Sequence, residues 1–359
     1  MHNAASHKGP DTVGKGNVSS VSLANDDTCC SAVLEVNELC VEFATAEGQY
    51  RAVDGVTFEL RRGATVGLVG ESGSGKTVTA LSIMQLLPKP TGRVLSGSIR
   101  FLGQELVGQP EHELRALRGN RISMIFQEPT TCLNPLITVG DQVAEVLRVH
   151  KGLSRRDALE ETLKLFELVK IAAPRERLHA YPHQLSGGMR QRVMIAMAIA
   201  CNPDLLIADE PTTALDVTVQ AQILALLEEL RVQSSAAILL ITHDLGIVAE
   251  MCDEVLVMYA GQIVEQADVY TLFSRPLHPY TLGLLRSLPK MEHGKSRLTL
   301  YSIPGTVPDP RHFPSGCRFH PRCEFAEARC KSEIPAFTHA DKNHLVRCHL
   351  WDKIESREL

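Results

Sequence analysis

The segment Gly70–Thr77 constrains the fold of this chain more than any other part of the sequence. It fits the pattern G-x-x-x-x-G-K-[ST]. The apolar run Ala64–Val69 precedes it and fits a strand, and a helix is expected from Thr77 to Leu87, where Pro88 ends it. A glycine-rich loop between a strand and a helix cradles phosphate with its backbone amides. The sequence therefore predicts an α/β fold with a nucleotide-binding loop.

The residue types of this loop match distinct parts of a nucleotide. Its glycines permit backbone angles and close approach that a Cβ would forbid. Lys76 places a positive charge at the β- and γ-phosphates, and Thr77 offers a hydroxyl to Mg²⁺. The residues expected to contact ATP are Gly70, Glu71, Ser72, Gly73, Ser74, Gly75, Lys76, Thr77 and Val78.

Polar side chains follow three further apolar runs. Asp209 and Glu210 end one run, where Asp209 can reach Mg²⁺ and Glu210 can polarise water as a general base. The alternative for Glu210 is a surface acid that caps the next turn. His243 ends a second run and can stabilise the γ-phosphate, although a lone histidine is more often structural. Gln127 ends a third, and its amide can bind Mg²⁺ or the attacking water.

A second glycine turn, Ser186-Gly187-Gly188, opens another expected helix. Such an N-terminus is a second anion-binding end. One chain needs only one such end beside its own phosphate loop, so we expect this turn to serve the nucleotide of a second subunit.

Composition bounds the organisation of the chain. Its 359 residues suffice for two or three domains, and a net charge of −5 gives no general attraction to nucleic acid. Neither a signal peptide nor an apolar run long enough to span a bilayer is evident, so we expect a cytosolic chain that reaches a membrane through a partner. The expected divisions are a disordered tail over 1–32, an ATPase domain over 33–268 with a helical insertion over about 111–186, and a proline-rich extension over 269–359 with little secondary structure.

Four of the ten cysteines gather near the C-terminus, with 5, 6 and 17 residues between them: Cys317, Cys323, Cys330 and Cys348. In a reducing cytosol this indicates metal rather than disulfides. The spacing matches neither common zinc pairs nor the usual ferredoxin patterns, so zinc, an iron–sulfur cluster and ordinary buried thiols stay open. The arginines beside these cysteines, Arg318, Arg322 and Arg329, are expected to offset thiolate charge, and the neighbouring His320 and His349 are expected to be structural.

Together these motifs resemble those of ABC-type ATPases over about residues 34–268. The resemblance implies a mixed sheet flanked by helices, an antiparallel β part and a helical insertion. It also implies two subunits joined head to tail, in which Ser186, Gly187 and Gly188 complete the partner's ATP site and Asp216 lies between the sites. An aromatic residue of this family stacks on adenine; Tyr50 is the candidate here, and Phe43 is the alternative.

A closer resemblance is to the ATPases of peptide importers, and specifically to the first of their two unlike ATPases. The importer resemblance rests on Glu71–Lys76, Phe126–Pro129, Leu133–Pro135, Pro211–Thr218, His278–Tyr280 and Gly316–Cys323. The resemblance to the first of the two ATPases rests on Gly188–Met197, and Thr77 replaces a more usual serine. It implies import of di- or oligopeptides from the cytoplasmic face of a bacterial inner membrane, with ATP and Mg²⁺. The implied partners are a second ATPase, two membrane permease subunits and, indirectly, an extracytoplasmic peptide-binding protein.

The resemblance further implies a four-iron four-sulfur cluster on the four cysteines. Nickel, glutathione or an opine as cargo, a soluble ABC ATPase of DNA repair or translation, and an ATPase gated by a redox-sensing cluster are the alternatives.

Overall fold

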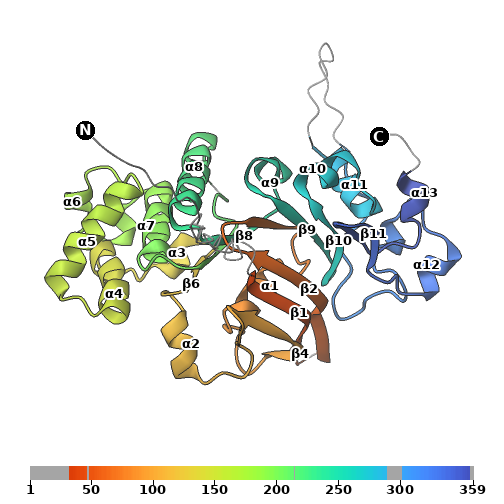
Figure 1. Cartoon of the computed structure of the whole chain (residues 1–359), viewed down its shortest axis with the longest axis horizontal. Coiled ribbons are helices and arrows are strands. Elements are labelled where there is room, and N and C mark those ends of the chain that lie inside the picture. The colour runs from red at the N-terminus through yellow and green to blue at the C-terminus, as the bar shows by residue number, and fades with distance from the viewer. Residues whose placement is uncertain (1–31, 47, 214, 289–300, 356–359) are drawn as a thin grey trace, which may run out of the picture.

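The computed structural model describes residues 32–46, 48–213, 215–288 and 301–355, and these residues form two β-sheets with helices packed around them (Figure 1). The tail expected over 1–32 therefore lies, except for Ala32, outside the described residues. No helix of the described part is long and apolar enough to cross a membrane.

The larger sheet is mixed, as the sequence predicts. Its strands, in spatial order, are β11 (Thr338–Asp341), β12 (His344–Val346), β10 (Gln262–Asp268), β9 (Glu254–Tyr259), β3 (Thr65–Val69), β8 (Ala237–Thr242), β7 (Leu205–Asp209) and β6 (Ile122–Ile125). The strands from β9 to β6 run parallel, and β10, β12 and β11 add antiparallel pairs at one side. The phosphate loop leaves β3, which lies in the parallel part.

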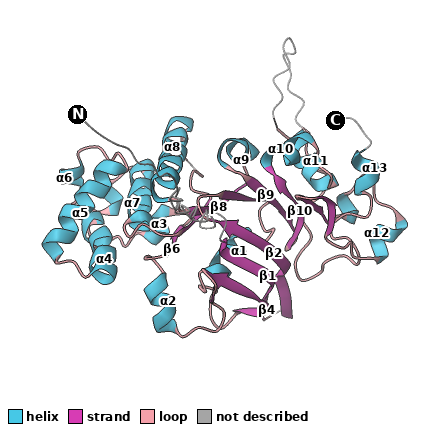
Figure 2. Ribbon diagram, viewed as in Figure 1, coloured by secondary structure: helices cyan, strands magenta, loops and turns pink. Residues whose placement is uncertain are grey.

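Both faces of this sheet are buried, which explains the unbroken apolar strands. In β8, Ile238 and Leu240 pack into one hydrophobic core, whereas Leu239 and Ile241 pack into the other. Helices cover the faces, as Figure 2 shows. The covering helices are α1 (Lys76–Ile83), α7 (Gly187–Ile199), α8 (Val217–Ser234) and α9 (Leu245–Met251). Helix α1 ends before the expected Leu87, because Gln85 adopts a left-handed φ of 53° that a helix cannot continue.

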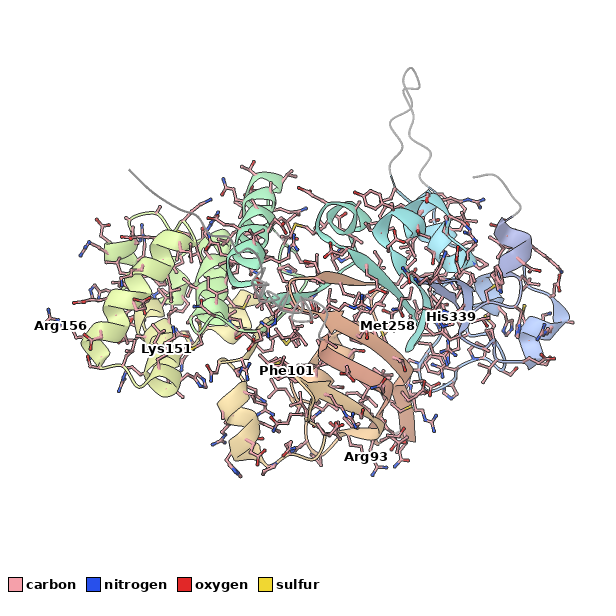
Figure 3. All side chains as sticks on the ribbon, viewed as in Figure 1. Arg93, Phe101, Lys151, Arg156, Met258 and His339 are labelled. Atoms are coloured by element: carbon pink, nitrogen blue, oxygen red, sulfur yellow. The ribbon has the colours of Figure 1, made fainter. Side chains whose placement is uncertain are left out.

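The smaller sheet is the expected antiparallel part. Its strands, in spatial order, are β2 (Gly48–Arg61), β1 (Ala32–Thr45), β4 (Gly92–Phe101) and β5 (Gln104–Glu105). Phe101 and Met258 are both buried in the core between the two sheets (Figure 3). This packing fixes β2 beside the β9–β10 turn, where the main-chain amide of Asp54 donates to the carbonyl of Gly261 (2.8 Å).

The helical insertion expected over 111–186 is interrupted by a strand of the larger sheet, β6. Short helix α2 (Glu111–Leu117) precedes this strand. The helices after it form a separate lobe at the left of Figure 1, ending where α7 begins. They are α3 (Pro129–Cys132), α4 (Val139–Lys151), α5 (Arg155–Leu168), α6 (Pro174–Arg177) and the 3₁₀ turn η2 (Pro182–Gln184). In α5, Phe166 is buried.

The C-terminal extension has more secondary structure than its prolines suggest. It contains α10 (Val269–Ser274), α11 (Pro279–Arg286), the 3₁₀ turn η3 (His320–Arg322), α12 (Ala328–Ser332) and α13 (Trp351–Glu355), besides β11 and β12. Because β12 pairs with β10, the extension continues the larger sheet. An aromatic cluster joins it to the ATPase core: the ring of Phe319 lies 5.2 Å from that of Tyr259 and 5.5 Å from that of Tyr280.

Candidate nucleotide site

A cavity of about 290 Å³ lies over the phosphate loop that connects β3 to α1. Most residues that the sequence assigns to ATP contribute to its wall, and β2, the β9–β10 turn and the C-terminal extension complete it. The lining residues are Tyr50, Ala52, Ser72, Gly73, Gly75, Lys76, Thr77, Val78, Gln127, Glu210, Gly261, Pro310 and Phe313. Gly70, Glu71 and Ser74 of the predicted set do not line it.

Glycines of the loop are required by close backbone packing. Gly70 has a φ of 154°, and a Cβ there would collide with the carbonyl of Met258. Gly75 has a φ of 109°, and its Cβ would lie 2.7 Å from both the Ala52 carbonyl oxygen and the Met258 side chain. Any other residue at these positions would push the loop away from the sheet.

Lys76 lies folded inside the loop. Its Nζ donates to the carbonyls of Gly70 (2.7 Å) and Glu71 (2.9 Å) and approaches the hydroxyl of Ser74 (3.5 Å). Burial lowers the pKa of Lys76, and the nearby carboxylates of Glu210 and Asp209 oppose that shift. The ammonium thus lies at the centre of the phosphate cradle.

Asp209 has the environment expected of a metal ligand. Its side chain is only 1% exposed, and its Oδ1 has no hydrogen-bond partner. Burial raises the pKa of Asp209, and a hydrogen bond from Thr77 counteracts the rise. A buried carboxylate oxygen without a partner is costly unless a cation or proton satisfies it. Carboxylate and hydroxyl oxygens suit Mg²⁺, so the pair fits this ion.

Glu210 is held at the cavity edge by three side chains. Gln127 Nε2 donates to its Oε2 (3.0 Å), as does Thr213 Oγ1 (2.9 Å), and His243 Nδ1 lies 3.1 Å from its Oε1. Burial raises the pKa of Glu210, but the hydrogen bonds with His243 and Thr213 and the charge of Lys76 outweigh burial and lower it overall. Its φ of 48° is unusual for a side chain with a Cβ, and such strain is typical of functional positions.

Of the two aromatic candidates for the base, Tyr50 lines the cavity. Phe43 lies behind it, with the rings stacked at 5.7 Å and inclined by 16°. The pairing orients the Tyr50 ring. The structure therefore favours Tyr50 over Phe43 as the contact.

The second glycine turn stands apart from this cavity. Ser186 caps α7 by accepting a hydrogen bond from the Met189 amide (3.3 Å), and both Ser186 and Gly187 are exposed. Asp216 caps α8 in the same manner, from the Val219 amide (2.9 Å). None of these residues, nor Gly188, lines the cavity of its own chain.

The C-terminal extension contacts the phosphate loop directly, which the sequence did not indicate. Arg322, 4% exposed at its side chain, forms a two-pronged ion pair with Glu71 (2.6 and 3.0 Å). The Tyr280 hydroxyl accepts the Glu71 amide (2.8 Å). Both polar ends of Glu71 are thus engaged by the extension, which explains its absence from the cavity wall.

The arginines near the cysteines therefore have carboxylate partners. Arg318 pairs with Asp54, Arg322 with Glu71 and Arg329 with Glu333 (2.8 Å). The expectation that they offset thiolate charge is wrong for this arrangement, since acidic side chains already neutralise them. The two histidines are structural, as expected: His320 Nδ1 lies 2.9 Å from the Cys317 carbonyl, and His349 Nε2 lies 3.0 Å from that of Glu333.

The four C-terminal cysteines lie close enough to influence one another. Burial raises the pKa of Cys348 to about 12, and the other three add to the rise. Burial likewise raises the pKa of Cys323 to about 11, with Cys317 and Cys330 adding to it. However, no group of three or more His, Cys, Asp or Glu among the described residues is arranged to hold a metal ion. The structure gives no support for a metal here, and the iron–sulfur cluster stays a prediction.

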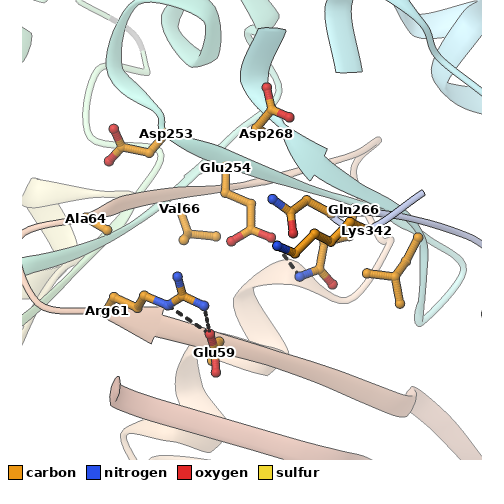
Figure 4. Close-up of a pocket in the computed structure, with 11 residues that line it drawn as sticks. Glu59, Arg61, Ala64, Val66, Asp253, Glu254, Gln266, Asp268 and Lys342 are labelled. Carbon is orange, nitrogen blue, oxygen red and sulfur yellow. Dashed lines mark hydrogen bonds and ion pairs between the residues drawn. The ribbon is translucent and has the colours of Figure 1, made fainter. Parts of the chain in front are cut away.

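A second cavity, of about 370 Å³, lies under the β11–β12 hairpin (Figure 4). Acidic side chains line it, but they have partners: Arg61 pairs with Glu59, and Gln266 donates to Glu254 (2.8 Å). No phosphate cradle or orphan ligand faces it. The nucleotide cavity is therefore the stronger candidate site.

The fold and this site define an ABC-type ATPase, and comparisons with known proteins agree. The ABC transporter family matches residues 53–213, and the family described as "oligopeptide/dipeptide transporter, C-terminal region" matches residues 264–330. The dimeric structure of MJ0796, a bacterial ABC transporter cassette, is 25% identical, with a TM-score of 0.60 over 66% of this chain and 98% of that one.

Relatives in bacteria extend the match to nearly the whole chain. The oligopeptide transport ATP-binding protein AppD of Bacillus subtilis is 49% identical over 90% of this chain and 98% of that protein. OppD of Salmonella typhimurium is 52% identical over 85% of this chain and 90% of its own. The chain therefore belongs to the family of ATP-binding subunits of oligopeptide/dipeptide ABC transporters, which are ABC-type ATPases coupled to peptide transport.

Proposed function

We propose that this chain binds MgATP in the cavity over its phosphate loop, hydrolyses it with Glu210 as general base, and energises the import of oligopeptides. The observation that carries this proposal is the pairing of a buried, partnerless Asp209 oxygen with a neighbouring carboxylate held by three side chains. Asp209 is suited to bind the metal ion, and Glu210 is suited to activate water.

The geometry supports a division of labour among these residues. When bound, Mg²⁺ would neutralise charge on the transferring phosphoryl group, held by Thr77, Asp209 and Gln127. Lys76 stabilises the same charge from within the loop. Glu210, ionised at neutral pH because its pKa is lowered, accepts a proton from water. His243 lies 3.1 Å from Glu210 and orients this carboxylate, and we propose that it also stabilises the γ-phosphate when ATP is bound.

The assembly follows from the second glycine turn. Because Ser186, Gly187 and Gly188 do not line the cavity of their own chain, their helix end is free for a partner's nucleotide. We propose a head-to-tail pair with a second, unlike ATPase, in which Asp216 lies between the sites. Two membrane permease subunits and an extracytoplasmic peptide-binding protein complete the machine at the cytoplasmic face of the membrane. The names of AppD and OppD support oligopeptides as the cargo.

We further propose that 33–268 forms the ATPase domain and 269–359 an extension whose four cysteines bind a four-iron four-sulfur cluster. Backbone N–H groups already approach three of the sulfurs, including the Leu350 amide at 3.3 Å from Cys348 Sγ. Such donors suit thiolate acceptors.

One experiment tests the assembly and the cluster together. The chain is purified anaerobically from its own membranes, and its partners, iron and zinc are measured on one sample. We expect a second ATPase, two membrane proteins and about four irons per chain. Recovery of a lone chain with ribosomes or nucleic acid would overturn the importer, whereas zinc in place of iron would discard only the cluster.

A further inference from the structure

We propose that Phe313, a residue of the C-terminal extension, packs against the adenine base and forms the second aromatic wall of the ATP site. This inference rests on the proposed nucleotide site and deepens it. It makes the extension part of the nucleotide pocket, in addition to its place on the larger sheet.

The position of Phe313 within the cavity favours the base end. Phosphates are fixed by Lys76 and Thr77, and the carboxylate of Glu210 lies beside Gln127 at the reacting end. The remaining wall is formed by Tyr50 and Ala52 of β2, by Gly261 in the β9–β10 turn, and by Pro310 and Phe313. Among the described residues that line the cavity, this wall is the part left for an adenine whose phosphates occupy the loop.

The Phe313 ring is held in place by Arg318. The guanidinium carbon lies 4.1 Å from the ring centroid, so it covers one face of the ring. Arg318 is itself fixed, because it pairs with Asp54 of β2 and donates to the Ala260 carbonyl (2.5 Å). The ring's other face or its edge is therefore the part that lines the cavity.

This arrangement is suited to a base and not to phosphate. An aromatic ring offers dispersion and stacking to a flat neutral ring, and an arginine behind it adds polarisation. Tyr50 supplies a similar surface from β2, backed by Phe43. The cavity thus has two aromatic side chains, each supported by its own neighbour, and they come from segments far apart in the sequence. Such a pair is suited to a planar ligand bound between them.

The test compares a ligand that has a base with one that lacks it. Dissociation constants of the purified full chain for MgATP and for inorganic tripolyphosphate are measured by titration calorimetry. Phe313→Ala is expected to weaken MgATP about tenfold, the effect of losing one aromatic stack. Its affinity for tripolyphosphate should match that of the unaltered chain. Phe313→Leu, which keeps apolar volume without an aromatic face, is expected to show much of the same loss even if the alanine variant folds poorly.

Phe337→Ala is the matched control. Phe337 belongs to the same extension and also packs against an arginine, with the Arg347 guanidinium 5.2 Å from its ring, but it does not line the cavity. Its affinity for both ligands should be unchanged. Unaltered MgATP affinity in both Phe313 variants, or an equal loss for both ligands, would overturn the inference. Lys76→Ala should abolish binding of both ligands, and failure of the unaltered chain to bind either would instead refute the proposed site.

Discussion

At the residue scale, Glu210 carries the sharpest chemical expectation. Three side chains hold its carboxylate in place at the edge of the cavity, and the backbone conformation is strained. Glu210→Gln keeps the shape but removes the proton acceptor. We expect the hydrolysis rate to fall about 100-fold or more, because that is the usual contribution of a general base.

Binding is expected to survive the same change. MgATP affinity, measured by calorimetry, should stay within about threefold, because Glu210 contacts water and not the phosphates in this scheme. Glu128→Gln, at an exposed position that does not line the cavity, is the control and should hydrolyse ATP normally. Rapid turnover by Glu210→Gln would remove Glu210 from the role of base.

The residues found from sequence and those missed differ in a physical way. Local sequence patterns identify Lys76, Thr77 and Asp209, because a phosphate loop and a strand end fix their positions. No such pattern identifies Phe313 and Arg322, since neither follows a strand. Arg322 acts through Glu71 of the loop, and Phe313 shares a cavity with Tyr50 of β2, in each case more than 200 residues earlier. Arg322 lies beside the cysteines, which suggested a different role for it, and Phe313 belongs to no motif that the sequence analysis identified.

At the scale of elements, α11 links pH to stability. His278 caps this helix by accepting the Tyr280 amide at Nδ1 (3.0 Å) and is fully buried. Burial lowers its pKa to about 3, and the positive charge of Arg347 adds to the shift. An unfolded histidine takes up its proton near pH 6.5. The unfolded state therefore binds more protons below that pH, and the folded state loses stability as pH falls from about 6.5 toward 3.

His278→Asn should remove this dependence. Asparagine can also accept the Tyr280 amide as a cap, so stability at pH 7.5 should change by only about 1 kcal/mol. The free energy of unfolding is measured by urea titration at several pH values between 6.5 and 5. For His278→Asn it should change less steeply with pH than for the unaltered chain, by up to about 1.4 kcal/mol per pH unit. The exposed His339 provides the control, as His339→Asn should leave the slope intact. Parallel curves for His278→Asn and the unaltered chain would contradict the assignment.

Elements differed in how well the sequence predicted them. Strands β3, β7 and β8 were predicted because apolar runs buried on both faces have few other solutions. Strands β11 and β12 were missed, since they are short, polar and defined by pairing with β10, a distant partner. Strand β6 was read into the insertion, although its four residues are all buried in the sheet.

At the scale of the whole molecule, the extension and the ATPase core form one packed body. Glu265 of β10 is fully buried and accepts the amides of Leu277 (2.6 Å) and His278 (2.9 Å), while its carboxylate lies 2.8 Å from His344 Nε2. With the Arg322–Glu71 pair, this ties both ends of the extension to the sheet that carries the phosphate loop.

We propose that the second glycine turn, by contrast, serves a nucleotide only in an assembly, and Ser186→Asp tests this. Aspartate is a good helix cap and is favourable at an N-terminus, so folding of the isolated chain should be unaffected. Its own MgATP affinity should also be unchanged, because Ser186 does not line its cavity. In the assembled transporter the added carboxylate would face the partner's γ-phosphate.

ATP hydrolysis at that composite site should then fall about 100-fold, comparable to the loss of a preorganised donor at a developing negative charge. The comparison is between ATP affinity of the isolated chain and turnover of the reconstituted complex. Loss of affinity in the isolated chain would mean that Ser186 serves its own nucleotide. Unchanged turnover in the complex would mean that it serves neither. Only a defect confined to the complex fits a nucleotide shared between two chains. Such sharing would also account for the exposure of the capped end of α7 in the single chain.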